Sequence, residues 1–164
     1  MIIGLTGVVL AGGRSSRFGS NKALAAWKGA SLIEAAVKSL REVTPHVLIV
    51  TKEEASLAFL QSEGADLIKD RFDEHHPLGG LHTALENLET SHAFVCACDM
   101  PFIQPRLIEA LWAARADYDA VIPVWQGARQ PLFGIYSKKC AGLVRGAIAA
   151  GERGISPLFD CLRT

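Results

Sequence analysis

Residues 8–22 carry the groups in this chain that are most clearly suited to binding phosphate. The segment reads Val-Val-Leu-Ala-Gly-Gly-Arg-Ser-Ser-Arg-Phe-Gly-Ser-Asn-Lys, an apolar stretch that runs into a glycine-rich loop. Gly12 and Gly13 have no Cβ atom, so the backbone there can adopt positive φ and approach a ligand closely. Successive N–H groups of the loop can then form a concavity that binds an anion. Three basic side chains add charge that suits a polyphosphate: Arg14, Arg17 and Lys22.

This segment predicts a nucleotide site, although an ordinary turn could have the same composition. Its spacing is neither Gly-x-Gly-x-x-Gly nor the Walker A pattern, so it supports neither a dinucleotide-binding motif nor a P-loop. The alternative is a strand-to-helix turn with solvated arginines.

A second candidate is Asp99, which directly follows the apolar run of residues 93–98. Pro101 disfavours the α conformation for Met100 and helps to end the strand, which places Asp99 at the strand's carboxyl end. A carboxylate there can coordinate Mg²⁺, which takes few protein ligands and keeps water and phosphate oxygens around it. The alternative is an aspartate that caps a turn or a helix.

Composition and charge exclude some classes of partner. The 17 basic and 17 acidic residues give a formal net charge of zero, which does not favour non-specific attraction to nucleic acid or to a membrane. The longest unbroken apolar run, residues 93–98, is too short to span a bilayer. The first residues lack a basic leader and a cleavage pattern, so we expect no signal peptide.

The four cysteines predict reduced thiols. Cys96 and Cys98 alternate along a strand, so their side chains point to the same face. Cys140 lies on an apolar helical stripe and Cys161 near the end of the sequence, and no spacing fits a zinc site. Free cysteine packs as a small hydrophobe, so we expect buried thiols and a cytoplasmic protein.

Strand and helix patterns alternate along the chain. Short apolar runs predict strands at residues 7–10, 46–50, 66–68, 93–98, 120–124 and 131–136. Helical patterns lie between these strands. Two of them start at Ser31 and Thr51, each with a glutamate three residues later as in a capping box. The others start at Leu81, after a turn of Pro77, Gly79 and Gly80, at Pro105, and at Ser137, with Gly151 ending the last helix. We therefore predict a single three-layer α/β/α domain over residues 1–164 with a mostly parallel sheet.

In such a sheet, ligands bind beyond the carboxyl ends of the strands. The glycine loop, Asp99 and the polar segment of residues 70–81 all follow predicted strands. We therefore expect these three segments to meet at one edge of the sheet.

Residues 10–22 resemble the signature of the molybdenum cofactor guanylyltransferases, the family of molybdopterin-guanine dinucleotide biosynthesis protein A, in the nucleoside-triphosphate transferase superfamily. That signature reads Leu-Ala-Gly-Gly-x-Ser-x-Arg-Met-Gly and then Asp-Lys. Residues 70–81 and 98–101 resemble the family's Asp…Gly-Pro-Leu-Ala-Gly and Cys-Asp-x-Pro segments, and residues 130–136 resemble a later strand near the acceptor pocket. The resemblance covers about residues 5–160 and implies a Rossmann-like nucleotidyltransferase.

The resemblance implies that GMP is transferred from GTP to the terminal phosphate of molybdopterin, with pyrophosphate leaving. No general base is needed, because the phosphate nucleophile is already ionised, and alignment and charge neutralisation suffice. The resemblance also implies protein partners that take part in the maturation of molybdoenzymes. The resemblance implies that Lys22 and Arg14, assisted by Arg17, hold the triphosphate and that Asp99 carries Mg²⁺. It implies that Asp70 accepts hydrogen bonds from ribose or base. The backbone that would recognise guanine and cradle phosphate is that of Leu10, Ala11, Gly12 and Gly13.

The chain departs from the family pattern at several positions. Asn21 replaces the usual aspartate, Phe18 a methionine and His76 a glycine, and Thr51-Lys52 lacks the usual asparagine. The family's carboxyl-terminal Asn-x-Asn-Thr-Pro segment is absent, so either the chain is truncated or its acceptor site is completed differently.

Some alternatives stay open. One is a cytidylyl- or sugar-phosphate nucleotidyltransferase of the same superfamily, and another is a non-catalytic nucleotide-binding module. Arg129 either meets the phosphate of an anionic acceptor or is an exposed hairpin arginine. The side chains of the polar loop other than Asp70 are expected to be solvated: Asp73, Glu74, His75 and His76.

Overall fold

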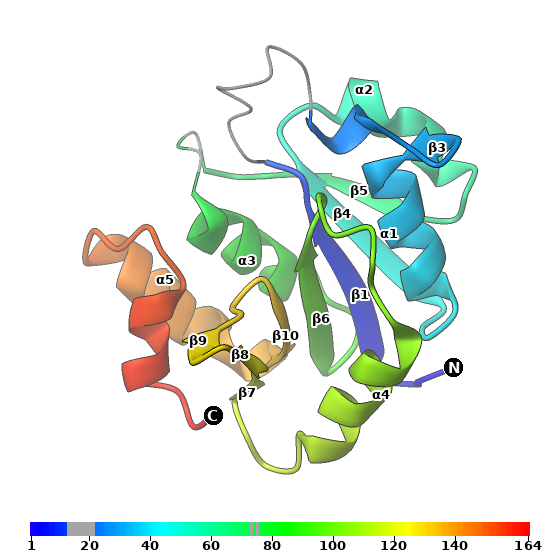
Figure 1. Ribbon diagram of the computed structural model, residues 1–164. Coiled ribbons are helices and arrows are strands. Elements are labelled where there is room, and N and C mark those ends of the chain that lie inside the picture. Colours follow the sequence, from blue (N-terminus) through cyan, green and yellow to red (C-terminus); the bar gives the residue numbers. More distant parts are fainter. Residues whose placement is uncertain (13–21, 73, 75) are drawn as a thin grey trace.

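A computed structural model describes residues 1–12, 22–72, 74 and 76–164 of the chain. Within these residues, six strands form one sheet in the order β5-β4-β1-β6-β10-β7 (Figure 1). The strands are β5 (Asp66–Lys69), β4 (His46–Thr51), β1 (Leu5–Leu10), β6 (His92–Ala97), β10 (Phe133–Ser137) and β7 (Ala120–Val121). Neighbours among the first four run parallel, and β10 is antiparallel to both β6 and β7. The prediction of an α/β fold with a mostly parallel sheet is confirmed.

The central strand β1 is buried on both faces, which explains why its sequence does not alternate and is apolar except for Thr6. Val9 packs in one core cluster and Val8 in the other. The first cluster joins the sheet to α1 (Leu32–Arg41) and α4 (Pro105–Ala114), and the second joins it to α3 (Pro77–Glu86) and α5 (Ala141–Ala149). The helices therefore cover both faces of the sheet, as Figure 1 shows.

One predicted capping box is confirmed and the other is wrong. Ser31 caps α1, because its Oγ accepts from the Glu34 N–H at 3.3 Å while the Glu34 carboxylate accepts from the Ser31 N–H at 2.7 Å. Thr51, in contrast, is the last residue of β4, and its Oγ1 accepts from the Glu53 N–H at 3.1 Å. That bond turns the chain locally, and the short α2 (Glu54–Leu57) that follows has no side-chain cap before it continues into η2 (Ala58–Gln61).

Other element boundaries also differ from the prediction, among them those of α3 and β7. α3 begins at Pro77 rather than Leu81, so Gly79 lies inside its first turn rather than in a loop. The strand predicted at residues 120–124 is shorter in the structure, where β7 covers only Ala120–Val121. Pro123 lies just beyond it and has no N–H to donate to a neighbouring strand. The residues after it form a separate hairpin, β8 (Val124–Trp125) and β9 (Ala128–Arg129), whose two turn residues both have positive φ.

The remaining elements connect these layers. η1 (Lys22–Leu24) leads into a small hairpin of β2 (Ala26–Trp27) and β3 (Ala30–Ser31). Ser137 caps η3 (Lys138–Cys140), which continues into α5, and Gly151 follows that helix with φ of +93°, as predicted. A final 3-10 helix, η4 (Ser156–Asp160), packs with the α5 side of the core.

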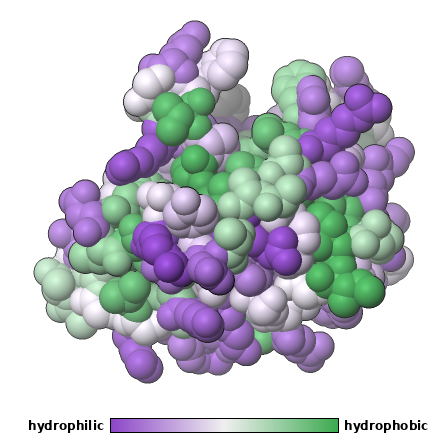
Figure 2. Space-filling view, turned by 90° about the horizontal axis from the view of Figure 1, so that it is seen from below, coloured by the Kyte–Doolittle hydropathy of each residue, from purple (hydrophilic) through white to green (hydrophobic). Residues whose placement is uncertain are grey.

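The prediction of buried thiols is confirmed for Cys96 and Cys140, whereas Cys98 is only partly buried. Cys96 and Cys98 both pack on the α1 and α4 face, and Cys140 is buried. Cys161 directly follows η4 and is exposed, so its predicted burial is wrong. None of the described helices is long and apolar enough to cross a bilayer. Figure 2 shows the side of the molecule on which the amino ends of the central strands lie, with apolar groups dispersed among polar ones.

Candidate nucleotide site

The carboxyl end of β1 is held between the two neighbouring strands. The Ala11 N–H donates to the Val50 carbonyl at 2.8 Å, and the Cys98 N–H donates to the Leu10 carbonyl at 3.2 Å. A Cβ placed on Gly12 would lie 3.7 Å from Asp70 Oδ2, so the chain leaves β1 directly beside this carboxylate. Gly13, Arg14 and Arg17, which the sequence also predicts here, lie outside the described residues.

Lys22 and Asp99 meet at this edge of the sheet, although 77 residues separate them in the sequence. Lys22 opens η1, Asp99 follows β6, and the Lys22 ammonium donates to the Asp99 carboxylate in an ion pair. That hydrogen bond, and the negative charge of Asp99, raise the pKa of Lys22. The side chains remain 45% and 34% exposed, so both groups are accessible to a ligand.

Asp70, in contrast, is almost fully buried just after β5. Its Oδ1 accepts from the Thr83 hydroxyl at 3.1 Å and from the Phe72 N–H at 3.2 Å. Its other oxygen, Oδ2, is the one that faces Gly12. One half of the carboxylate is therefore used to anchor the β5–α3 connection to α3, and the other half is directed at the glycine segment.

The amino end of α3 is capped by an imidazole. His76 Nδ1 accepts from the Gly79 N–H at 2.8 Å, and Phe72 lies against the same ring with 5.7 Å between ring centroids. Burial, and next the charge of Arg153, lower the pKa of His76, which favours the neutral form that can accept this bond. The prediction of a solvated His76 is therefore wrong, because the ring replaces the serine or aspartate that usually caps a helix.

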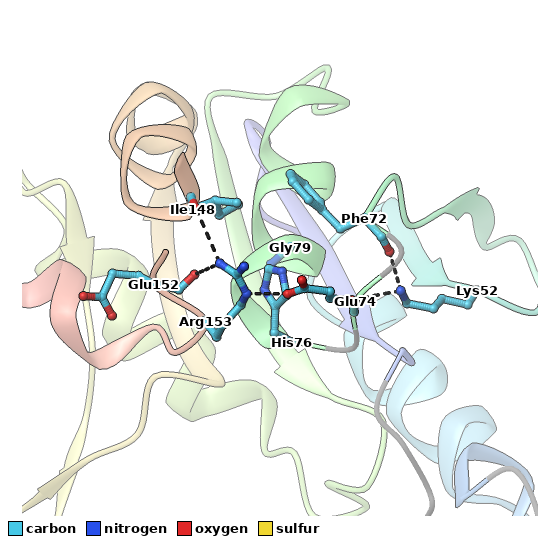
Figure 3. Close-up of polar contacts among 8 residues, drawn as sticks. All are labelled: Lys52, Phe72, Glu74, His76, Gly79, Ile148, Glu152 and Arg153. Carbon is cyan, nitrogen blue, oxygen red and sulfur yellow. Dashed lines mark hydrogen bonds and ion pairs between the residues drawn. The ribbon is translucent and has the colours of Figure 1, made fainter. Parts of the chain in front are cut away.

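Two basic residues hold the β5–α3 connection from outside. The Lys52 ammonium donates to the carbonyl oxygens of Phe72 and Glu74, and the Arg153 guanidinium forms an ion pair with the Glu74 carboxylate (Figure 3). Glu74 is exposed, as expected for a solvated side chain, and it also forms this ion pair. Lys52 could have been noticed as the residue that replaces the family's asparagine, whereas nothing in the local sequence marks Arg153.

Asp70 and Asp99 flank the end of β1 from opposite sides. The strand order places β4 and β1 between β5 and β6, so three strand spacings, roughly 14 Å, separate the ends of the strands that precede these aspartates. An extended ligand across β4 and β1 could reach both groups. Among the described residues, no three His, Cys, Asp or Glu side chains cluster as metal ligands would. Mg²⁺ bound to a nucleotide needs only one or two carboxylates, so Asp99 fits that ion.

Cys98 is next to this site but is not poised as a nucleophile. Burial raises its pKa to about 11, and the charge of Asp99 acts in the same direction. The thiol is therefore protonated at neutral pH, and the chemistry of the site belongs to the charged groups around it.

Comparison with known proteins identifies the family. A model of the MobA-like NTP transferase domain matches residues 7–163. The chain belongs to this family. The resemblance seen in the sequence is thereby confirmed, and the fold around the glycine segment is that of MobA-like transferases.

Individual relatives agree with this assignment. A protein of Geobacillus sp. named "Probable molybdenum cofactor guanylyltransferase" is 35% identical over 94% of this chain and 81% of its own length. One of the same name from Halalkalibacterium halodurans is 32% identical over 96% and 82%. The crystal structure of molybdopterin-guanine dinucleotide biosynthesis protein A from Archaeoglobus fulgidus superposes with a TM-score of 0.80 and 28% identity, covering 96% of this chain and 80% of that one.

Proposed function

We propose that this MobA-like enzyme transfers GMP from GTP to molybdopterin and releases pyrophosphate, forming the guanine dinucleotide of the molybdenum cofactor. The two relatives named "Probable molybdenum cofactor guanylyltransferase" match this chain over most of their own length. The observation that carries the mechanism is the ion pair of Lys22 with Asp99 at the carboxyl edge of the sheet. It places a cation and a carboxylate, both accessible, where a parallel α/β sheet binds its ligand.

Lys22 is the residue that we assign to the triphosphate. Its pKa is raised by Asp99, so the ammonium stays protonated through the whole physiological range. It has three donors on a flexible stem and can exchange part of its contact with Asp99 for phosphate oxygens. Arg14, with Arg17, is proposed to share this task. Each cation offsets charge that develops on the phosphates as the bond to pyrophosphate breaks.

Asp99 is the residue that we assign to the divalent metal, which we propose to be Mg²⁺. Held by this carboxylate, the ion would neutralise negative charge on the phosphates during the transfer. The Asp99 carboxylate lies against the Lys22 ammonium and is 34% exposed, so a cation could reach it.

The nucleoside is assigned to the β1 side of the site. The backbone of Leu10, Ala11 and Gly12, continued by Gly13, would recognise guanine through its N–H and carbonyl groups. Asp70 Oδ2 faces Gly12 and would accept a hydrogen bond from ribose or base. These contacts align the α-phosphate with the acceptor phosphate, which is the main requirement of a reaction whose nucleophile is already ionised. We further propose that residues 1–164 act as one catalytic domain in the cytoplasm.

The test is pyrophosphate release from each of four nucleoside triphosphates with Mg²⁺, in the presence and absence of molybdopterin. GTP with molybdopterin should be the productive combination. Release with CTP alone would refute the guanylyl assignment, and release with a sugar phosphate but not with molybdopterin would refute the acceptor.

The Asp99→Asn variant tests the assignment of the metal. Turnover should fall by about 100-fold or more while GTP binding changes little, because the substitution removes a charge that acts mainly in the transition state. Asp117→Asn is a matched control, since Asp117 is exposed on the connection between α4 and β7, at the other end of the sheet. Equal turnover in the two variants would contradict the role of Asp99.

A further inference from the structure

The connection between β5 and α3 carries the groups that face the nucleoside side of the site. It begins with Asp70 beside Gly12 and ends with the His76 cap of α3. Among the described residues, the Thr83 hydroxyl and the Phe72 N–H donate to the Asp70 carboxylate at the start of the connection. The backbone carbonyls of Phe72 and Glu74 lie between this start and the His76 cap.

Lys52 fixes that backbone from the β4 side. Its ammonium donates to the Phe72 carbonyl and, at 2.9 Å, to the Glu74 carbonyl. The two acceptors lie two residues apart on the connection, and Lys52 directly follows β4 on the sheet. A single side chain thus ties the connection to the rigid sheet at two points, and a lysine can do so because it has three donors.

Arg153 fixes the same segment from the α5 side (Figure 3). Its guanidinium donates to the Glu152 carbonyl at 3.0 Å and forms an ion pair with the Glu74 carboxylate. The bond and the charge of Arg153 lower the pKa of Glu74, and the charges of His76 and Lys52 act in the same direction. The Glu74 side chain is 64% exposed, so we expect the Arg153 contact to be the weaker of the two.

We infer that Lys52 and Arg153 are positioning residues, which hold the β5–α3 connection from opposite sides so that Asp70 and the capped end of α3 are in place before the nucleotide binds. The inference rests on the proposed function in one respect, namely that Asp70 faces the bound nucleoside. Lys52 acts through two backbone carbonyls and Arg153 through a carboxylate, so neither has to touch the substrate. Loss of either should weaken nucleotide binding and leave the chemical step unchanged.

The test compares Lys52→Met, which keeps the length of the side chain but removes its donors, with Lys52→Arg, which keeps donors and charge. In Lys52→Met we expect amide hydrogen exchange at Phe72 and Glu74 to become about tenfold faster without nucleotide. The KM for GTP should rise about tenfold, with kcat within about twofold. Lys52→Arg should restore most of both. Lys69→Met is the control, because Lys69 is an exposed lysine at the end of the neighbouring β5.

Arg153→Ala should give a smaller rise in KM, about two- to threefold, because its ion pair is exposed. The Lys52→Met, Arg153→Ala double variant should have a KM below the product of the two single effects, since both residues act on one segment. Fully multiplicative effects would contradict a shared target.

Three results would overturn the inference. A rise in KM without faster exchange in the nucleotide-free protein would mean that Lys52 binds the nucleotide directly. A fall in kcat at unchanged KM would place it in the chemical step. Unchanged exchange and unchanged kinetics would mean that the contact positions nothing. If no triphosphate were turned over, the proposed function would fail, whereas the exchange comparison would still decide whether Lys52 holds the connection.

Discussion

The two adjacent glycines of α3 provide a sharp test of how the helix meets the site. In an ordinary helix, replacing either glycine by alanine should stabilise the protein by up to about 1 kcal/mol, because alanine loses less backbone entropy on folding. The surroundings of Gly79 and Gly80 are different, however. A Cβ on Gly80 would lie 3.4 Å from a methyl group of Leu10, which is ordinary contact. A Cβ on Gly79 would lie 2.9 Å from His76 Cε1 and 3.1 Å from Phe72 Cδ2.

The two substitutions should therefore have opposite signs. In Gly79→Ala the His76 ring must move, and the cap that it provides is worth about 1 kcal/mol. Crowding against Phe72 adds about 1–3 kcal/mol, so the gain from helix propensity is exceeded and a net loss of about 1–3 kcal/mol results. Gly80→Ala should gain up to about 1 kcal/mol. For a chain of this length, each kcal/mol shifts Tm by about 2–4 °C.

Urea unfolding and thermal unfolding of the two variants beside the wild type measure these differences directly. The KM for GTP should also rise in Gly79→Ala, because the displaced His76 and Phe72 belong to the connection that carries Asp70. Equal stabilisation by both alanines would refute the packing described at the start of α3. A destabilised Gly79→Ala with normal KM would separate that packing from nucleotide binding.

Three further predictions concern the core and the thiols. Gly134→Ala should destabilise the protein by about 1–3 kcal/mol in urea unfolding, because its Cβ would lie 3.0 Å from the Val121 carbonyl oxygen in the neighbouring strand; a neutral effect would argue against the pairing of β10 with β7. His82 is buried and neither ring nitrogen has a hydrogen-bond partner among the described residues, so burial lowers its pKa below 6.5. The unfolded chain then binds a proton at His82 more readily than the folded protein does. The free energy of unfolding that neutral His82 contributes is therefore fully present above about pH 6.5 and is lost as the pH falls towards the folded-state pKa. His82→Gln should flatten the dependence of the unfolding free energy on pH between pH 8 and 5, and an unchanged dependence would contradict this. Cys161 should react with a thiol reagent at pH 8 well before Cys98, whose pKa is raised to about 11; mass mapping of the first modified cysteine checks the order.

The sequence was sufficient for the framework of this protein. Strands that are buried on both faces are largely apolar, so the apolar runs at residues 7–10, 46–50 and 93–98 predicted the main part of β1, β4 and β6. The capping box at Ser31 was visible because both partners lie within four residues. Asp70 and Asp99 could be placed at one edge of the sheet because the carboxyl ends of parallel strands share that edge.

Tertiary structure decided which of these groups touch. The contacts at this site join residues that lie 20 to 79 positions apart in the sequence. They are the ion pair between Lys22 and Asp99 and the contacts of Lys52 and Arg153 with the β5–α3 connection. Periodicity records how a residue relates to its near neighbours along the chain, and it contains nothing about such pairs. His76 shows the same limit at short range, because the imidazole can cap the helix only in its neutral form, which burial favours here, and only where a glycine leaves room for the ring. The types of residue at this site follow from the sequence, whereas their partners follow from the order of the strands and the packing around them.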